Sequence, residues 1–245
     1  MRRSPFSGTS TPELRILTWN LFHGRSVPAA GRDLSAQFAA LLAGWSWDVA
    51  LLQEVPPWWP PRLARAARAE QRTVLTSRNS GLWMRRFLAE RRPDLIKSNG
   101  GGCNAILARR AIVEHHTLHL RLWPERRVAQ LARLSDGTCV VNYHASARVK
   151  LAEAELQRLW DQALQWAAED PLILGGDLNL RNPTAPRDDT VHFARRDVDH
   201  LFARGLRTSG GAELLDRHLT LAGGQVELSD HVPLLGTVRG EPSIA

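Results

Sequence analysis

The sequence predicts a layered α/β or α+β domain, because stretches with strand character alternate with amphipathic helical stretches. The strand-like stretches are rich in Val, Ile and Leu or alternate apolar with polar residues. They cover residues 14–21, 49–55, 103–110, 137–145, 171–177, 198–203 and 231–238. Over 33–43 and 149–168, leucines and aromatic residues recur on one face at helical spacing. A basic helix is predicted over 82–91, ended by Pro93.

The length of 245 residues allows a sizeable core, and no internal repeat or low-complexity linker divides the chain. We therefore expect a flexible tail over 1–12 and one domain over 13–240, acting as a monomer. No apolar run approaches the roughly 20 residues that span a bilayer, and the N-terminus lacks the apolar core of a signal peptide. Cys103 and Cys139 are too few for a disulfide scaffold. These features predict a cytoplasmic protein without stable membrane insertion.

The net charge of +7 favours a polyanionic partner. Nearly all of the positive charge is arginine, since Lys97 and Lys150 are the lysines of the chain. A chain rich in Ala and Arg is also what a GC-rich genome produces without functional demand. Basicity alone is therefore weak support for nucleic acid binding.

The stretch PLILGGDLNLRN, residues 171–182, ends an apolar strand in two glycines and then places Asp177 and Asn179 two residues apart. Side chains beyond a strand end alternate in direction, so these two point the same way. They form either a polar site or a loop in which Asp177 caps the next element.

Other predicted strands also end in unusual polar residues. Asn20 ends LRILTWN, Glu54 ends VALLQE, and His144 ends VVNYH. Asp199 lies within the apolar VDHLFA, and Asp230 with His231 precedes the last strand. Each has an ordinary structural explanation on its own, such as a turn residue or a satisfied core histidine. Together they are expected to converge, because buried polar groups cost free energy unless they satisfy one another.

The ordered set TWN, QE, H, GDLN and SDH resembles the endonuclease/exonuclease/phosphatase superfamily of metal-dependent phosphoesterases, which includes deoxyribonuclease I and exonuclease III-type enzymes. The segment GGCNAILARR is also similar to that family's GNAILSR, and the resemblance runs from about Leu14 to Val238. It implies a four-layer α/β/β/α sandwich of two packed mixed sheets, with helices outside and the active site at one edge of the sheets.

The resemblance implies a metal site built on Glu54, with Asn20 and Asp230 as further ligands or as partners of the ligands. Oxygen donors without cysteine are typical of Mg²⁺ or Mn²⁺. One position departs from the family: Phe22 stands where abasic-site enzymes carry a metal-binding acid. Metal binding should therefore depend chiefly on Glu54.

The resemblance also assigns the catalytic residues. Asp177 orients or deprotonates the attacking water, and Asn179 holds a phosphate oxygen. His231 pairs with Asp199, which fixes its tautomer and favours its protonated form. His144 matches a position beside the phosphate. The implied reaction is hydrolysis of a phosphodiester by in-line water attack. We expect His200 to be structural, and we expect His23 to line the cleft without a catalytic role.

The substrate is less determined, because the fold and motifs do not select a phosphoester. A DNA endonuclease or exonuclease is favoured by arginines near the motifs. These are Arg25, Arg85, Arg86, Arg91, Arg92, Arg148 and Arg181. Arg148, Arg181 and Asn104 are the polar substrate-binding candidates.

Trp58 and Trp59 in PPWWPP follow Glu54 closely and are predicted either to contact a base or lipid at the rim or to pack inside. A lipid-headgroup (sphingomyelinase-like) or small-molecule phosphodiesterase and a catalytically inactive binding module therefore remain as alternatives.

Overall fold

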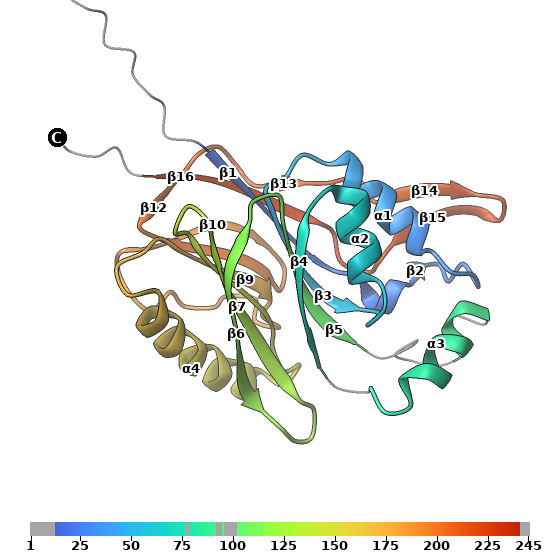
Figure 1. Ribbon diagram of the computed structural model, residues 1–245, viewed down its shortest axis with the longest axis horizontal. Coiled ribbons are helices and arrows are strands. Elements are labelled where there is room, and N and C mark those ends of the chain that lie inside the picture. The colour runs from blue at the N-terminus through green and yellow to red at the C-terminus, as the bar shows by residue number, and fades with distance from the viewer. Residues whose placement is uncertain (1–12, 77–78, 92–94, 96–101, 241–245) are drawn as a thin grey trace, which may run out of the picture.

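The computed structural model describes residues 13–76, 79–91, 95 and 102–240. Two mixed β-sheets pack face to face, with helices on both outer faces (Figure 1). This α/β/β/α sandwich is the predicted fold class. The predicted tail over 1–12 and Arg92 lie outside the described residues. Among the described residues, no helix is long and apolar enough to cross a bilayer.

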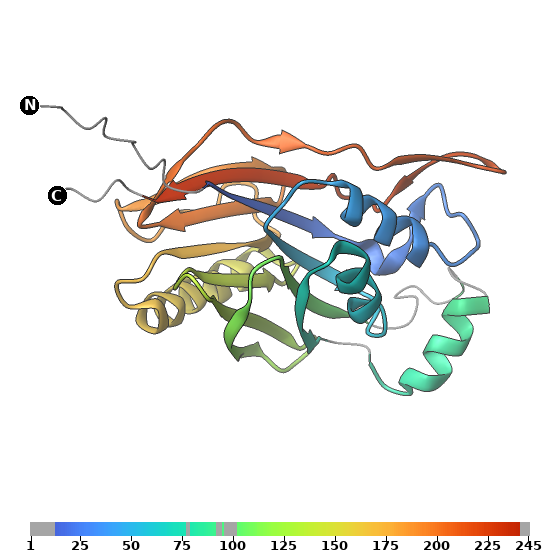
Figure 2. The same ribbon diagram turned by 45° about the horizontal axis from the view of Figure 1, so that its top comes forward.

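The first sheet is 7-stranded, and its strands β16 (red) and β1 (blue) lie in the upper part of Figure 2. Its order is β12 (Leu206–Thr208), β16 (Leu234–Gly240), β1 (Glu13–Asn20), β3 (Val49–Val55), β5 (Cys103–Ala108) and β4 (Glu70–Leu75), with β13 (Glu213–Leu214) also paired to β16. Strands β1 and β3 are parallel, and the other pairs in this sheet are antiparallel.

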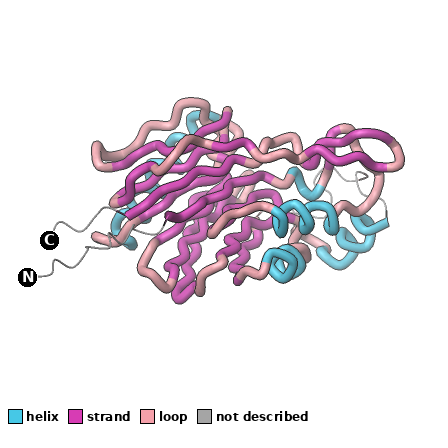
Figure 3. Tube along the Cα trace, turned by 90° about the horizontal axis from the view of Figure 1, so that it is seen from above, coloured by secondary structure: helices cyan, strands magenta, loops and turns pink. Residues whose placement is uncertain are grey.

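The second sheet is 6-stranded. Its order is β10 (Thr190–Arg196), β11 (Asp199–Arg204), β9 (Leu172–Asp177), β8 (Cys139–His144), β7 (Arg127–Leu134) and β6 (Ile112–Arg121). Strands β8 and β9 form its parallel pair. A 3-stranded sheet of β14 (His218–Leu221), β15 (Gly224–Leu228) and β2 (Ser26–Val27) extends from one end, as seen from above in Figure 3.

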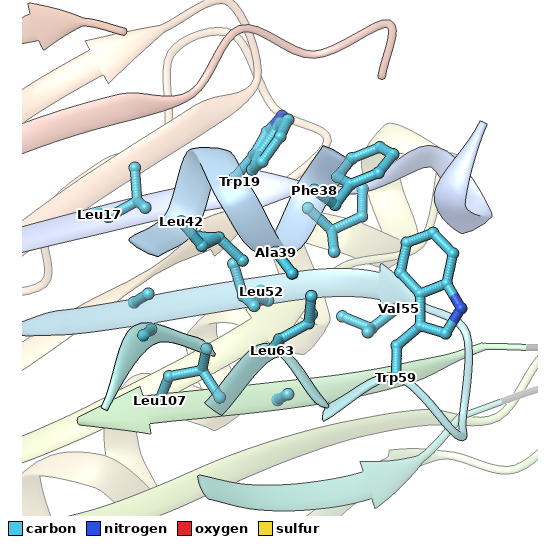
Figure 4. Close-up of a cluster of buried hydrophobic side chains, with 14 of the residues drawn as sticks. Leu17, Trp19, Phe38, Ala39, Leu42, Leu52, Val55, Trp59, Leu63 and Leu107 are labelled. Carbon is cyan, nitrogen blue, oxygen red and sulfur yellow. The ribbon is translucent and has the colours of Figure 1, made fainter. Parts of the chain in front are cut away.

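The helices are α1 (Ser35–Gly44), α2 (Pro60–Ala67), α3 (Leu82–Arg91) and α4 (Val149–Ala167), with a 3₁₀ turn η1 (Phe22–Gly24) after β1. Helices α1 and α2 cover the first sheet through a cluster that includes Trp19, Phe38 and Trp59 (Figure 4). Helix α4 covers the second sheet through a separate apolar cluster. A third cluster, with Leu51 and Ile173 at its centre, fills the space between the sheets.

The strand register brings the polar strand ends to one edge of the sandwich. In β8 and β9, His144 lies opposite Asp177, and Asp177 in turn lies opposite Asp199 of β11. In the facing sheet, Asn20 of β1 lies opposite Gln53 of β3, beside Glu54. The site is therefore fixed by the ends of two parallel strand pairs, one in each sheet.

The predicted strands and helices are all present, with ends shifted by a few residues. The sequence analysis did not predict α2 or the strands β2, β4, β6, β7, β10 and β12–β15. PPWWPP leads directly into α2, because Pro60 and Pro61 open that helix, where proline suits the first helical turn.

Candidate active site

The paired glycines before Asp177 allow close packing around β9. Gly176 has a φ of 140°, and a Cβ there would overlap the carbonyl oxygen of Tyr143 on β8. A Cβ on Gly175 would overlap Leu201 on the neighbouring strand β11. The absence of both side chains lets β8, β9 and β11 approach closely enough to set Asp177 between His144 and Asp199.

Glu54 is turned into the site by an irregularity near the end of β3. The register with β5 shifts between Leu52 and Val55, and Glu54 has a φ of 50°. Such a bulge re-aims a side chain at the rim of a sheet. Phe22, His23 and Asn179 also have positive φ values, so backbone conformations that are costly for these residue types gather around the cleft.

Asp177 is held by donors from both sheets. Its Oδ2 accepts a hydrogen bond from Asn20 Nδ2 at 2.9 Å, and its Oδ1 accepts one from the backbone N–H of Asn179 at 3.1 Å. His144 Nε2 lies 3.4 Å from Asp177 Oδ2. Burial raises the pKa of Asp177, while nearby His231 and the donated hydrogen bonds oppose that shift. A carboxylate with a raised pKa is a stronger base, as proton abstraction from water requires.

His231 and Asp199 form a hydrogen-bonded pair, with Nδ1 to Oδ2 at 2.8 Å. Burial alone would lower the pKa of His231, but the hydrogen bond and charge of Asp199, together with Asp177 and Asp230, raise it to about 9. The imidazole is therefore cationic at neutral pH. Its Nε2 lies 3.8 Å from Asp177 Oδ2, on the side of the ring that faces the cleft.

These side chains line one open cleft of about 290 Å³. The residues around it are Asn20, Phe22, His23, Glu54, Thr76, Glu125, Arg127, His144, Ala147, Asp177, Asn179, Asp230 and His231. The structure thus brings together the predicted Asn20, Glu54, His144, Asp177, Asn179, Asp230 and His231, with Asp199 directly behind His231.

The donor set of the cleft suits a hard divalent cation. Burial, followed by the charges of Asp177 and Asp230, raises the pKa of Glu54 to about 7. Mutual repulsion of this kind between carboxylates is offset by a bound cation. Asn20 Oδ1 accepts a hydrogen bond from the backbone N–H of Phe22 at 2.9 Å. Its second lone pair can bind the metal directly or accept a hydrogen bond from a group that does.

Asp177, Asp199 and His231 also offer ligand atoms within 4.8 Å of one another. In this group, His231 Nδ1 is already bonded to Asp199 Oδ2, and Asp177 accepts two other hydrogen bonds. The Glu54 carboxylate is contacted by His23 Nε2 at 3.2 Å and His144 Nε2 at 3.9 Å. Its raised pKa and the oxygen donors of Asn20 and Asp230 in the same cleft make this side the better place for a hard cation.

The structure corrects part of the predicted substrate-binding set. Trp59 is buried and packs against Phe38, with ring centroids 5.3 Å apart, so it does not stand exposed at the rim. Trp58 is half-buried against the same apolar cluster. Asn104 is also buried and donates to the backbone carbonyl of Val128 at 3.1 Å, away from the cleft lining.

Arg148 and Arg181 lie outside the cleft lining. Arg148 precedes α4 and is exposed. Arg181 is exposed and lies 3.4 Å from Asp197, but it borders a neighbouring hollow that it shares with Asn179. Both arginines can therefore contact only those parts of a substrate that extend beyond the cleft.

Arg127, a largely buried cation on the cleft wall at the start of β7, is not among the residues predicted from the sequence. Its Nη2 donates to Glu125 at 2.6 Å, and its buried Nε has no protein partner. A charged residue opening an apolar run was an available signal, but it was hidden among many other arginines. His23 lines the cleft as expected, with Nε2 3.2 Å from Glu54 Oε2.

A model of the endonuclease/exonuclease/phosphatase family matches residues 17–231. No curated protein matches the chain. Among solved structures, an endonuclease/exonuclease/phosphatase from Beutenbergia cavernae is 19% identical, with a TM-score of 0.70 over 95% of this chain and 73% of that one. TDP2 from C. elegans is 16% identical, with a TM-score of 0.70 over 96% and 78%. A functionally unknown protein from Enterococcus faecalis is 17% identical, with a TM-score of 0.66 over 93% and 100%.

Proposed function

Because the chain belongs to the endonuclease/exonuclease/phosphatase family, we propose that it is a divalent-metal-dependent phosphodiester hydrolase that acts on nucleic acid, with DNA as the first candidate. One observation carries this proposal. Glu54, Asp177 and Asp230 line the same open cleft as the cationic His231, which is hydrogen-bonded to Asp199. This combination provides a base, a cation and carboxylate ligands within reach of one phosphate group.

Glu54 and Asp230 would hold Mg²⁺ or Mn²⁺. Asn20 would either bind the metal itself or position one of the residues that bind it. When bound, the metal supplies positive charge that polarises the phosphoryl group and stabilises negative charge in the transition state. Position 22 holds Phe instead of an acidic residue, so Glu54 is the principal charged ligand from the N-terminal part of the chain.

Asp177 accepts a proton from the attacking water while the oxygen of that water forms a bond to phosphorus. The bond between phosphorus and the leaving oxygen breaks on the opposite side, and that oxygen takes a proton from the solvent or from an acidic side chain. Asn20 and the backbone N–H of Asn179 fix the Asp177 carboxylate in position for this transfer.

Positive charge and hydrogen-bond donors around Asp177 stabilise the charge that accumulates on the phosphoryl oxygens. His231 presents a protonated Nε2, and Asp199 keeps it protonated and oriented. His144 lies on the Asp177 side of the cleft, and Arg127 contributes a buried guanidinium on the wall. The Asn179 amide is aimed by the hydrogen bond that its Nδ2 donates to Ala145 O at 2.9 Å.

Nucleic acid is proposed over a lipid headgroup for reasons of charge and exposure. The net charge is +7 although the catalytic centre is acidic, and arginines lie on segments around it. The tryptophans that would have supported a lipid enzyme, Trp58 and Trp59, are partly or fully buried. We also expect a cytoplasmic monomer.

The test is an activity panel with duplex DNA, single-stranded DNA, RNA, sphingomyelin and bis-p-nitrophenyl phosphate, each with Mg²⁺, Mn²⁺ or chelator. Asp177→Asn, which keeps the side-chain shape, is the control for adventitious nuclease. We expect metal-dependent cleavage of a nucleic acid, with KM rising steeply with salt in proportion to the phosphates contacted. Charge reversal at Arg85 and Arg86 should flatten that salt dependence. Turnover of sphingomyelin or the small diester alone would assign a different substrate class.

A further inference from the structure

Large apolar side chains are exposed on α3 and at the tip of the β6–β7 hairpin. Among the residues that the structure describes, Trp83 and Trp123 are the most exposed tryptophans, at 80% and 81%. Phe87 on α3 is 51% exposed, and Leu122 at the hairpin tip is 73% exposed. Side chains of this kind cost free energy in water, so their concentration on adjoining segments marks an interaction surface.

This surface is continuous with the candidate active site. A second hollow of about 480 Å³ is lined by residues 76 and 79–80 on one side and by residues 122 and 124–126 on the other. It shares Thr76 and Glu125 with the catalytic cleft. Figures 1 and 2 both place the hairpin tip and the start of α3 along the same edge of the molecule.

Specific contacts hold the walls of this hollow together. Arg126, next to the hairpin tip, donates from Nη2 to the carbonyl oxygen of Thr76 at 2.8 Å and from Nε at 3.2 Å. At the start of α3, Arg85 Nε donates to the carbonyl oxygen of Ser80 at 2.8 Å. The hairpin is thus anchored to Thr76 after the end of β4. Asn79, before α3, donates from Nδ2 to the same Thr76 carbonyl oxygen at 2.9 Å.

A cation, Arg91, lies on the apolar face of α3 rather than opposite it. Trp83, Phe87 and Arg91 follow at intervals of four residues and share one helix face. The Arg91 guanidinium lies 3.7 Å from the centroid of the Phe87 ring. Arg86 is exposed on the same helix and pairs with Glu90 at 2.8 Å.

This arrangement fits a polyanion with flat faces better than a lipid interior. A helix that lies in a lipid interface keeps its cations on the polar face, away from the apolar one. Single-stranded nucleic acid instead offers alternating phosphates and unpaired bases, which arginines and aromatic rings bind respectively. Bases in a duplex are stacked on each other and present only their edges.

We propose that Trp83, Phe87 and Trp123, with Arg91 and the hollow between the segment before α3 and the hairpin tip, bind unpaired bases next to the scissile phosphate, so that the enzyme selects single-stranded nucleic acid. This inference rests on the proposed function and narrows its substrate class. The cleft holds the reacting phosphodiester, and the strand leaves it past Thr76 and Glu125 onto the aromatic surface.

The experiment measures binding separately from chemistry. Fluorescence anisotropy of a labelled oligothymidylate, in chelator so that no cleavage occurs, gives the affinity of the parent and of Trp83→Ala combined with Trp123→Ala. Each lost stack should weaken binding about 5- to 150-fold. The parent should also bind the single strand more tightly than a blunt duplex of equal length. Val113→Ala, an exposed apolar position on the same hairpin strand but near its other end, is the matched control and should not change the affinity.

Different failures separate the two proposals. If the parent cleaves oligonucleotides but the double variant binds oligothymidylate as tightly as the parent, the aromatic surface is not the base-binding site and only this inference falls. If the parent neither binds nor cleaves any nucleic acid, the proposed function fails and the inference fails with it. If the double variant loses only its binding to phosphatidylglycerol vesicles, the surface docks on lipid and the inference is overturned.

Discussion

Glu155 anchors the turn that follows His144, and its replacement should destabilise the protein strongly. The buried carboxylate accepts hydrogen bonds from Arg121 Nε at 2.5 Å and from the Tyr143 hydroxyl at 2.8 Å. It also accepts from Ser146, at 2.9 Å from the backbone N–H and 2.7 Å from Oγ. In Glu155→Gln, one of the two oxygens becomes an NH2 group. The hydroxyl that faces it can turn and accept, but the N–H that faces it, of either Arg121 or Ser146, loses its partner.

A buried donor left without a partner costs about 1–3 kcal/mol, which is the expected loss for Glu155→Gln. For a chain of this size, the corresponding decrease in Tm is roughly 2–12 °C. Glu153→Gln, an exposed position on the same helix, is the control and should stay within about 0.5 kcal/mol of the parent. Thermal unfolding followed by circular dichroism measures both variants.

The pH dependence of this effect has a definite sign. Burial would raise the pKa of Glu155, but the hydrogen bonds from Arg121, Ser146 and Tyr143 lower it below its ordinary 4.5. A carboxylate whose pKa is depressed in the folded state stabilises the protein above its unfolded pKa and loses that contribution as pH falls through the folded one. The Tm difference between parent and Glu155→Gln should therefore shrink below pH 4.5. A Tm within the control's range at neutral pH would refute the reasoning.

The remaining predictions concern the site itself. Gly176→Ala should cost at least about 2 kcal/mol of stability, because a Cβ at its φ of 140° overlaps the backbone of Tyr143; an unchanged unfolding midpoint in urea would contradict this. Asp199→Asn and His231→Ala should be non-additive in kcat/KM by about 1–3 kcal/mol, since each removes the function of the other; a double-mutant cycle with simple additivity would reject the pairing. The Mg²⁺ concentration for half-maximal activity should rise as pH is lowered from 8 to 6, because a proton on Glu54, whose pKa is about 7, competes with the metal; a flat profile would argue against Glu54 as the ligand.

The polar strand ends were predictable because a strand can be recognised from the residues of its own segment. Apolar runs ending in Asn20, His144 and Asp177 identify strands without knowledge of the tertiary structure. The cost of burying polar groups then required that these ends converge, and the register of β8 with β9 sets His144 opposite Asp177.

The position of Trp59 was not predictable from its neighbours. Its burial depends on α2, which begins directly after it, and on Gly24, where a Cβ would overlap the Trp59 ring. The contact between Gly24 and Trp59 joins segments far apart in the sequence. Arg127 was missed for a related reason: its burial comes from the tertiary placement of the start of β7 at the cleft wall, and nothing local distinguishes it from the other arginines.

The central claim is that Glu54 holds a divalent cation that the phosphodiester hydrolysis requires. Isothermal titration of Mn²⁺ into the parent and into Glu54→Gln, paired with oligonucleotide cleavage on the same samples, tests it most directly. The account predicts that the parent binds Mn²⁺ and cleaves only in its presence, whereas Glu54→Gln stays folded, binds the metal much more weakly and loses most of its turnover. Full activity of the parent in chelator, or parental Mn²⁺ affinity and cleavage in Glu54→Gln, would contradict it.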